Sequence, residues 1–200
     1  MARRSDHSRE ELKEMAIAAA ENILDAEGMA GLSTRKVAAA IGYTVGTLYL
    51  VFKNIDDLIL HVNARTLDSL HGALTEAVGG TDSTEAAMKK LAHAYIKFAT
   101  EQNARWSLLF EHRLPKDQDL PPWFEEKVLA LFALVERQLS AKDAEPTEES
   151  LVAARAIWSA VHGLCVLSLS EKLAVGGEVS IDVVADSLVE NYLRGLMART

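Results

Sequence analysis

The residues between positions 43 and 47 have the types and the spacing to contact bases in a DNA groove. Threonine and valine offer methyl contacts to thymine and weak hydrogen bonds, whereas arginine would make a bidentate fork to guanine. A glycine among them lets the backbone approach the duplex closely. We therefore expect modest direct readout of bases, with part of the specificity coming from DNA shape. The expected base-facing residues are Tyr43, Thr44, Val45, Gly46 and Thr47.

A second group of residues has the chemistry to hold DNA phosphates. Ser33 and Thr34 begin a short helix, where free backbone N–H groups bind anions. The Tyr49 hydroxyl and the Lys53 ammonium are the expected side-chain contacts. Each residue also has a structural interpretation, since Tyr49 can simply pack, Lys53 can be solvated and Thr44 can be a helix cap. The joint spacing favours DNA contact over these alternatives.

Two short helices joined by a tight turn are needed to position these side chains. Gly42 supplies the turn, and Thr44 is placed to cap the helix over residues 45–49. Leu48 and Phe52 are spaced to face inward, and Asn54 is placed to cap a third helix. This pattern predicts a helix-turn-helix, whose second helix enters the major groove.

The residues from Gly42 to Tyr49, followed by Phe52-Lys53-Asn54 and Asp57-Leu58, resemble the signature of the tetracycline-repressor (TetR) family. The resemblance covers roughly the first sixty residues. It implies an all-helical, homodimeric, ligand-responsive transcription regulator, and the family pattern agrees with phosphate contacts at Tyr49 and Lys53. Two positions depart from it, because Val51 stands where many relatives have a polar or aromatic phosphate contact and Ile55 stands where a lysine is common. The arginines of the N-terminal arm are candidates to compensate for that loss: Arg3, Arg4 and Arg9.

Helical periodicity continues along the rest of the chain, and no segment alternates as a strand does. We predict an all-α protein of nine helices in two domains. Residues 1–54 form a DNA-binding unit of three helices, and residues 55–200 form a helical bundle for effector binding and dimerisation. The other expected helices span residues 8–27, 55–78, 85–100, 101–113, 123–141, 147–173 and 181–198, with caps at Asp82, Thr147 and Ser180 and a stop at Gly176-Gly177.

Aromatic residues and histidines are concentrated in the predicted bundle. Trp158 and His162 lie four residues apart on one helix face, with Gly163 beside them, and this pattern resembles a C-terminal subtype of TetR-like regulators. The resemblance places an apolar effector pocket in this region, and such pockets carry a few polar groups. His93 and His112 are further candidates for those polar groups. The expected ligand-binding residues are Tyr95, Trp106, Phe110, Trp158 and His162.

The last two predicted helices carry more apolar surface than packing within one chain requires. This favours a homodimer with a two-fold, four-helix interface. The expected interface residues are Val161, Leu164, Leu188 and Tyr192. A two-fold protein matches an approximately palindromic operator.

Composition and charge limit the other classes of function. The net charge of −8 lies in residues 55–200, because residues 1–54 contain equal numbers of acids and bases. The single cysteine, Cys165, fits a reducing cytoplasm, and we expect neither a signal peptide nor a membrane partner. No nucleophile, phosphate-loop or metal-ligand motif supports an enzyme; Asp68-x-x-His71 is the nearest approach to a metal motif. We therefore expect no catalytic residue, metal or cofactor.

The sequence thus predicts a cytoplasmic regulator that binds double-stranded DNA. It is expected to act as a repressor that leaves a palindromic operator when a small apolar or amphipathic effector binds. The alternative is a helix-turn-helix regulator whose body binds a protein partner and no small molecule.

Overall fold

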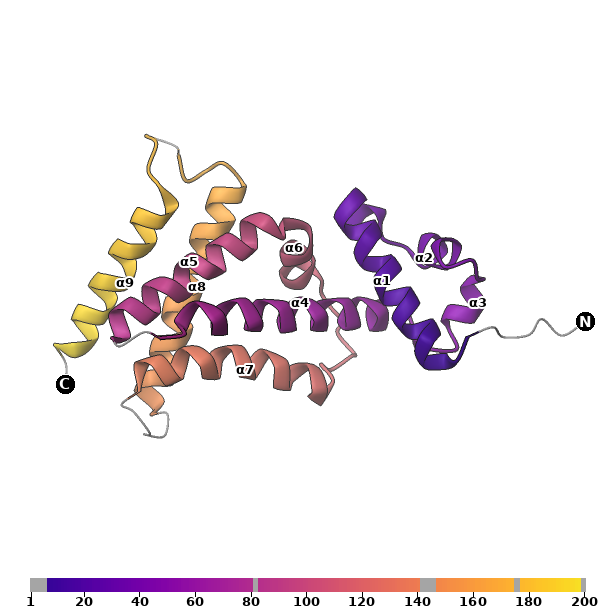
Figure 1. Ribbon diagram of the computed structural model, residues 1–200, viewed down its shortest axis with the longest axis horizontal. Coiled ribbons are helices and arrows are strands. Elements are labelled where there is room, and N and C mark those ends of the chain that lie inside the picture. Colours follow the sequence, from indigo (N-terminus) through magenta and orange to yellow (C-terminus); the bar gives the residue numbers. More distant parts are fainter. Residues whose placement is uncertain (1–6, 81–82, 141–146, 175–176, 199–200) are drawn as a thin grey trace, which may run out of the picture. The chain divides into compact units, whose positions relative to one another are not determined.

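The computed structural model of the chain describes residues 7–80, 83–140, 147–174 and 177–198, and these residues form helices without strands (Figure 1). The predicted all-α fold of nine α-helices is confirmed for these ranges, with one additional short 3-10 helix. The elements are α1 (Arg9–Glu27), η1 (Met29–Gly31), α2 (Thr34–Ala40), α3 (Val45–Leu48), α4 (Ile55–Val78), α5 (Thr84–Glu101), α6 (Asn103–Glu111), α7 (Pro122–Leu139), α8 (Glu148–Leu169) and α9 (Ile181–Met197).

The described chain divides into two compact units. One comprises residues 1–66 and 104–124, and the other comprises residues 67–103 and 125–200. Helix α4 contributes residues to both, since the division falls between Thr66 and Leu67. The sequence analysis divided the chain by function after residue 54, whereas these units are defined by contacts within the chain. The functional boundary therefore stays a prediction.

The first unit is built around the helix-turn-helix. Helix α1 begins at a capping box, in which Ser8 and Glu11 satisfy each other's backbone N–H groups. It ends at Gly28, whose φ of +69° is a conformation that favours glycine. The buried side chains of α1 pack on those of α2, α3 and α4 in one apolar cluster: Ala16, Ile17, Ala20, Leu24, Val37, Ala38, Leu48, Phe52, Leu58, Ile59, Val62 and Leu108.

Helix α6 belongs to this first unit, although it follows α5 in the chain. Leu108 is fully buried in the cluster just described. Arg105 makes a bidentate contact with Asp25 of α1, with Nε–Oδ1 and Nη2–Oδ2 distances of 2.9 and 2.6 Å. Burial and a paired charge therefore both hold α6 against the helix-turn-helix.

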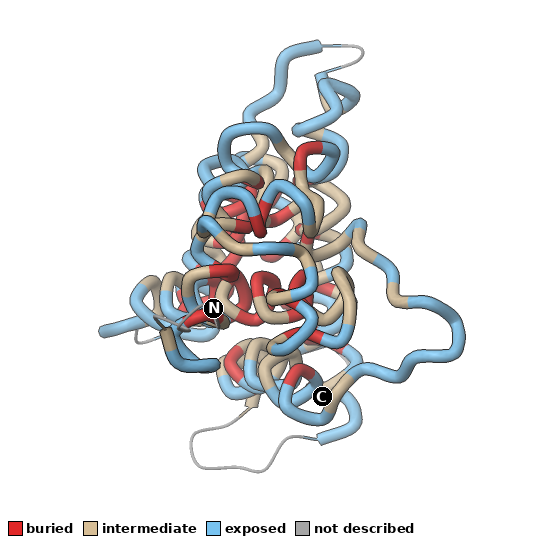
Figure 2. Tube along the Cα trace, turned by 90° about the vertical axis from the view of Figure 1, so that its right-hand side faces the viewer, coloured by how far each residue is buried: buried red, intermediate tan, exposed pale blue. Residues whose placement is uncertain are grey.

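In the second unit, α5 packs against α8 and α9, and α8 packs against α9. Figure 2 colours the trace of the chain by burial and shows buried, intermediate and exposed positions following one another along the helices. Lys89 of α5 pairs with Glu190 of α9, and this hydrogen bond holds the pKa of Glu190 below its usual range. One turn further along both helices, His93 Nε2 lies 2.9 Å from Asp186 Oδ1. The Lys89–Glu190 pair links α5 to α9, whereas His93 Nε2 and Asp186 Oδ1 face each other without the geometry of a hydrogen bond.

Several predicted helix ends differ from the structure. Ser83 caps α5 and accepts a hydrogen bond from the Ala86 N–H, whereas Asp82, Gly176, Arg3 and Arg4 lie outside the described residues. Helix α8 ends at Leu169 and not near residue 173, because the Ser170 hydroxyl bonds the Val166 carbonyl and Glu171 takes a positive φ of 58°. The backbone of Ser180 precedes α9, but its side chain makes no capping hydrogen bond.

Candidate DNA-binding surface and effector cavity

The recognition helix is short, and its own side chains hold its start. Thr44 is the N-cap, and its hydroxyl accepts a hydrogen bond from the Thr47 N–H at 3.3 Å, as the spacing predicted. The two hydroxyls also lie 3.0 Å apart. Gly42 adopts a φ of +74°, which gives the turn before the helix the expected conformation. Leu48 is buried beneath, so the opposite face of α3 is presented to solvent.

The predicted DNA-contacting residues differ in how far they are exposed to solvent. Tyr49 is 51% exposed, and Thr44, Gly46 and Lys53 are also exposed. Tyr43 is half-buried, with its hydroxyl 2.7 Å from Nδ1 of His7. The other candidates in this group are half-buried: Ser33, Thr34, Val45 and Thr47. Ser33 caps α2 by accepting from the Lys36 N–H.

A reciprocal cap fixes the segment that carries Lys53. The Lys53 N–H donates to Asp57 Oδ2 at 2.8 Å, and the Asp57 N–H donates to Asn54 Oδ1 at the same distance. Val51 and Ile55, the two departures from the family pattern, pack against the apolar cluster of the first unit. These two positions therefore contribute to the packing of the first unit.

Gly46 has no structural requirement for glycine within the protomer. A Cβ built at this position would lie 3.8 Å from Thr44 Oγ1, which is ordinary van der Waals contact. We expect Gly46→Ala to keep or raise the free energy of unfolding, by up to about 1 kcal/mol, because alanine favours helix. The same change should weaken operator binding if the backbone approaches the duplex here. Thermal melts and fluorescence anisotropy measure the two effects, and an unchanged operator affinity would place the close approach elsewhere.

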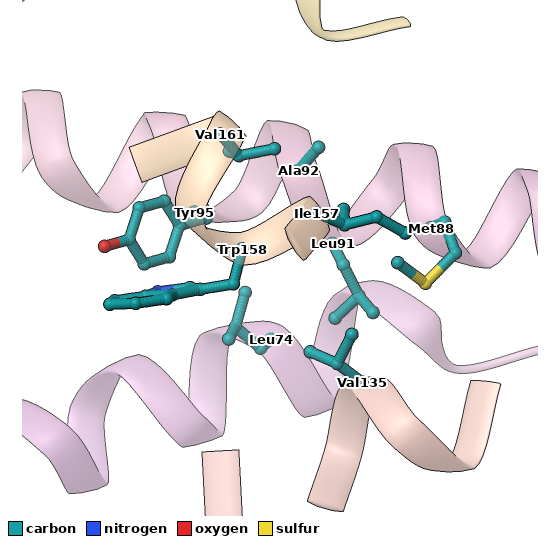
Figure 3. Close-up of a pocket in the computed structure, with 9 residues that line it drawn as sticks. All are labelled: Leu74, Met88, Leu91, Ala92, Tyr95, Val135, Ile157, Trp158 and Val161. Atoms are coloured by element: carbon teal, nitrogen blue, oxygen red, sulfur yellow. The ribbon is translucent and has the colours of Figure 1, made fainter. Parts of the chain in front are cut away.

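The second unit contains a small apolar cavity of about 40 Å³ (Figure 3). Helices α4, α5, α7 and α8 supply its walls. Tyr95 and Trp158 lie toward one end, and Met88, Leu91 and Val135 lie toward the other. The lining residues are Leu74, Met88, Leu91, Ala92, Tyr95, Val135, Ile157, Trp158 and Val161.

A polar group lies beside this cavity at His162. Its Nδ1 is 2.9 Å from the Tyr95 hydroxyl, and its ring centroid is 5.3 Å from that of Trp158. Burial lowers the pKa of His162, which keeps the imidazole neutral and able both to donate and to accept a hydrogen bond. Cys165, one turn further on, is buried, and burial raises the pKa of its thiol to about 12. Cys165 is therefore an unreactive packing residue.

The remaining aromatic and histidine candidates are placed elsewhere. Trp106 and Phe110 are in α6 of the first unit, with their ring centroids 5.2 Å apart, and neither lines this cavity. His93 faces Asp186, and His112 Nε2 lies 2.9 Å from Asp56 Oδ1. Sequence reasoning did not identify the aliphatic wall residues, because apolar periodicity indicates which face of a helix is buried but not which residues pack against it.

The predicted interface residues also fall into two groups. Val161 is 4% exposed and lines the cavity, so it leaves little surface for a partner. Leu164, Leu188 and Tyr192 are half-buried. More exposed apolar side chains lie on the same two helices, at Val152, Val166, Leu167, Leu169, Val183 and Met197.

A capped recognition helix with a solvent-facing surface, joined to a helical body, defines a DNA-binding transcription regulator. Residues 16–62 match the family described as bacterial regulatory proteins, tetR family. Residues 88–192 match the tetracyclin repressor-like C-terminal domain. Since this second match spans more than half of the chain, the protein belongs to the TetR family of transcription regulators. The family and the fold are those of regulators and not those of enzymes.

Individual relatives agree with this assignment. An uncharacterized helix-turn-helix-type transcriptional regulator of Mycobacterium tuberculosis is 28% identical over 200 residues, covering 100% of this chain and 86% of that protein. A protein of unknown function from Rhodococcus sp. RHA1 has the same fold, with a TM-score of 0.74, 23% identity and 98% of both chains covered. A TetR-family transcriptional regulator from Streptomyces coelicolor has a TM-score of 0.68 at 18% identity, with 96% of this chain and 82% of that chain covered.

Proposed function

We propose that this regulator is a cytoplasmic homodimeric repressor, released from a palindromic operator by a small apolar or amphipathic effector. The proposal of an effector rests on the apolar cavity beside His162, whose neutral imidazole can orient a ligand. Base contacts come from Tyr43, Thr44, Val45, Gly46 and Thr47, and phosphate contacts from Ser33, Thr34, Tyr49 and Lys53.

The size of the cavity supports a mechanism in which the ligand changes the body. A cavity of about 40 Å³ holds only a few waters, whereas pockets for drug-sized ligands reach roughly 300–1,000 Å³. An effector must therefore push the walls apart and stabilise an expanded arrangement of α4, α5, α7 and α8. Leu74 is the wall residue from α4, the helix that also begins directly after Lys53 and Asn54. Displacing α4 can thus disturb the recognition helices.

The exposed apolar surface of α8 and α9 supports dimerisation. Among the described helices, α8 is the one long and apolar enough to cross a membrane by length and composition, a test that core helices of soluble proteins also pass. Only 33% of its most apolar 18-residue stretch is buried within the chain. A second copy that packs α8 and α9 against their equivalents would cover this surface. Leu164, Leu188 and Tyr192 lie on the same helices and would contribute at the edge.

Operator release by amphipathic probes tests the effector proposal. Straight-chain alcohols and fatty acids of six to twelve carbons form a suitable probe panel. We expect at least one of them to weaken binding to the promoter of the protein's own gene by about tenfold, within the usual range of allosteric coupling. Ala92→Val adds two methyl groups to the cavity wall and should remove most of this response. Its operator affinity without probe should stay unchanged, since Ala92 belongs to the second compact unit and α3 to the first.

Leu129→Ala serves as the control, because Leu129 is 55% exposed on α7 and does not line the cavity. This variant should respond as the wild type does. A full response from Ala92→Val would exclude this cavity as the effector site. An operator complex that ignores every probe but is released by a protein would favour the alternative function.

A further inference from the structure

The contact between His7 and Tyr43 joins the start of α1 to the start of the recognition helix. His7 Nδ1 lies 2.7 Å from the Tyr43 hydroxyl, and the two rings meet edge to face with their centroids 6.0 Å apart. Both residues are half-buried and belong to the first unit. Sequence reasoning did not identify this pair, because 36 positions separate the two residues.

Helix caps hold the backbone on both sides of this contact. Ser8 is the N-cap of α1, and its capping box with Glu11 fixes the backbone next to His7. Tyr43 directly precedes Thr44, which is the N-cap of α3. The side chains of His7 and Tyr43 therefore start from two ordered backbone positions, and one of these positions adjoins the proposed DNA-facing surface.

The direction of this hydrogen bond depends on the charge of the imidazole. A neutral imidazole with its proton on Nε2 accepts at Nδ1, so the Tyr43 hydroxyl donates to it. A protonated imidazole carries hydrogen on both nitrogens, so Nδ1 donates and the Tyr43 oxygen accepts. In the second case the hydroxyl hydrogen of Tyr43 can be donated to another acceptor. Histidine is the side chain that changes charge between about pH 5 and 8.

The Glu11 carboxylate of α1 acts on the same imidazole. Two hydrogen bonds with Ser8 hold the pKa of Glu11 below its usual range, and the charge of a protonated His7 acts in the same direction. Glu11 therefore stays ionised from about pH 5 upward and does not itself titrate in the range where histidine does. A change in this region between about pH 5 and 8 would thus come from the imidazole.

We propose that His7 is a positioning residue for DNA binding, which in its protonated form makes the Tyr43 hydroxyl a hydrogen-bond donor to DNA. The inference rests on the proposed contact between Tyr43 and the operator. Phosphate oxygens are acceptors, as are N7 and O6 of guanine and O4 of thymine in the major groove. A released hydroxyl hydrogen matches these acceptors. DNA binding then favours protonated His7, so the affinity for DNA rises as the pH falls.

Fluorescence anisotropy on the full-length protein tests this inference across the range in which histidine titrates. The promoter of the protein's own gene and a duplex of unrelated sequence serve as the two probes. We expect the affinity for the promoter to rise at least fivefold from about pH 8 to about pH 5.5. A fivefold rise corresponds to about one net hydrogen bond.

Three variants assign the rise to this pair. His7→Gln should remove most of it, because glutamine takes up no proton in this range. Tyr43→Phe should remove it as well, although His7 is still protonated, because the hydroxyl is absent; a simple charge effect of His7 would persist in this variant. His71→Gln is the control, since His71 lies on α4 in the second unit, and it should keep the wild-type pH profile.

An affinity for the promoter that is the same at every pH would overturn the inference and leave the proposed function standing. A wild-type pH profile in either His7→Gln or Tyr43→Phe would overturn it equally. A protein that binds the promoter no better than the unrelated duplex would contradict the proposed promoter target. The pH profile on the unrelated duplex then decides the inference, because both duplexes present the same phosphate acceptors.

Discussion

Val166→Arg should convert the protein from a dimer into folded monomers. Val166 is 45% exposed on α8, so arginine there costs little within one protomer. At a two-fold interface the change occurs twice, and an unpaired buried charge costs about 3–5 kcal/mol. The dimer dissociation constant should therefore rise more than a hundredfold. Sedimentation velocity at micromolar concentration gives the mass, and circular dichroism shows whether the helices persist.

Leu129→Arg is the matched control for this change. Leu129 is a similarly exposed apolar residue, at 55%, but lies on α7. This variant should remain dimeric if α8 and α9 form the interface. A wild type that sediments as a monomer, or a Val166→Arg protein that stays dimeric, would refute the proposed interface.

Thr47→Ala and Tyr49→Ala should each weaken operator binding by about 1–3 kcal/mol without unfolding the protein. Tyr49 is 51% exposed, so its removal leaves no internal cavity. Thr47 keeps its backbone bond to Thr44 when its own hydroxyl is lost. Fluorescence anisotropy with the protein's own promoter measures the effect at a fixed salt concentration, which matters because phosphate contacts are salt-dependent.

Met29→Ala provides the comparison for these two variants. Met29 is 44% exposed on η1, outside the helix-turn-helix but within the same unit. It should bind the operator as the wild type does. Equal affinity for the wild type and both recognition-helix variants would require a different assignment of the DNA-facing surface.

The features that the sequence predicted well depend on residues close together in the chain. Thr44 caps α3 through a residue three positions away, and Gly42 turns the backbone by itself. Trp158 and His162 were expected on one face because they are one helical turn apart, and their rings do lie close together. Each of these interactions is set by helix geometry and local chemistry.

The features that were missed depend on distant partners. Arg105 and Asp25 are 80 positions apart, and nothing in the periodicity of α6 indicates that it packs on α1. Trp106 and Phe110 were expected to line one pocket with Trp158, because the family resemblance places an effector pocket in this region, but they do not line the cavity that Trp158 lines. Asn63 is buried in α4, although the stretch from Leu58 to Ala64 also contains the polar His61 and the sequence does not mark Asn63 as a core position.

The burial of Leu108 in the first unit has a consequence for synthesis on the ribosome. Residues 1–66 leave the exit tunnel before α6 does, so the nascent helix-turn-helix still lacks one side chain of its own apolar cluster. It also lacks the Arg105 contact that holds α6 to α1. Domains generally fold as units during translation, but this one is complete only when residue 124 has emerged. The DNA-binding end should therefore reach its final stability after α5 has been synthesised, and a fragment that stops at residue 66 should melt at a lower temperature than the same unit in the whole chain.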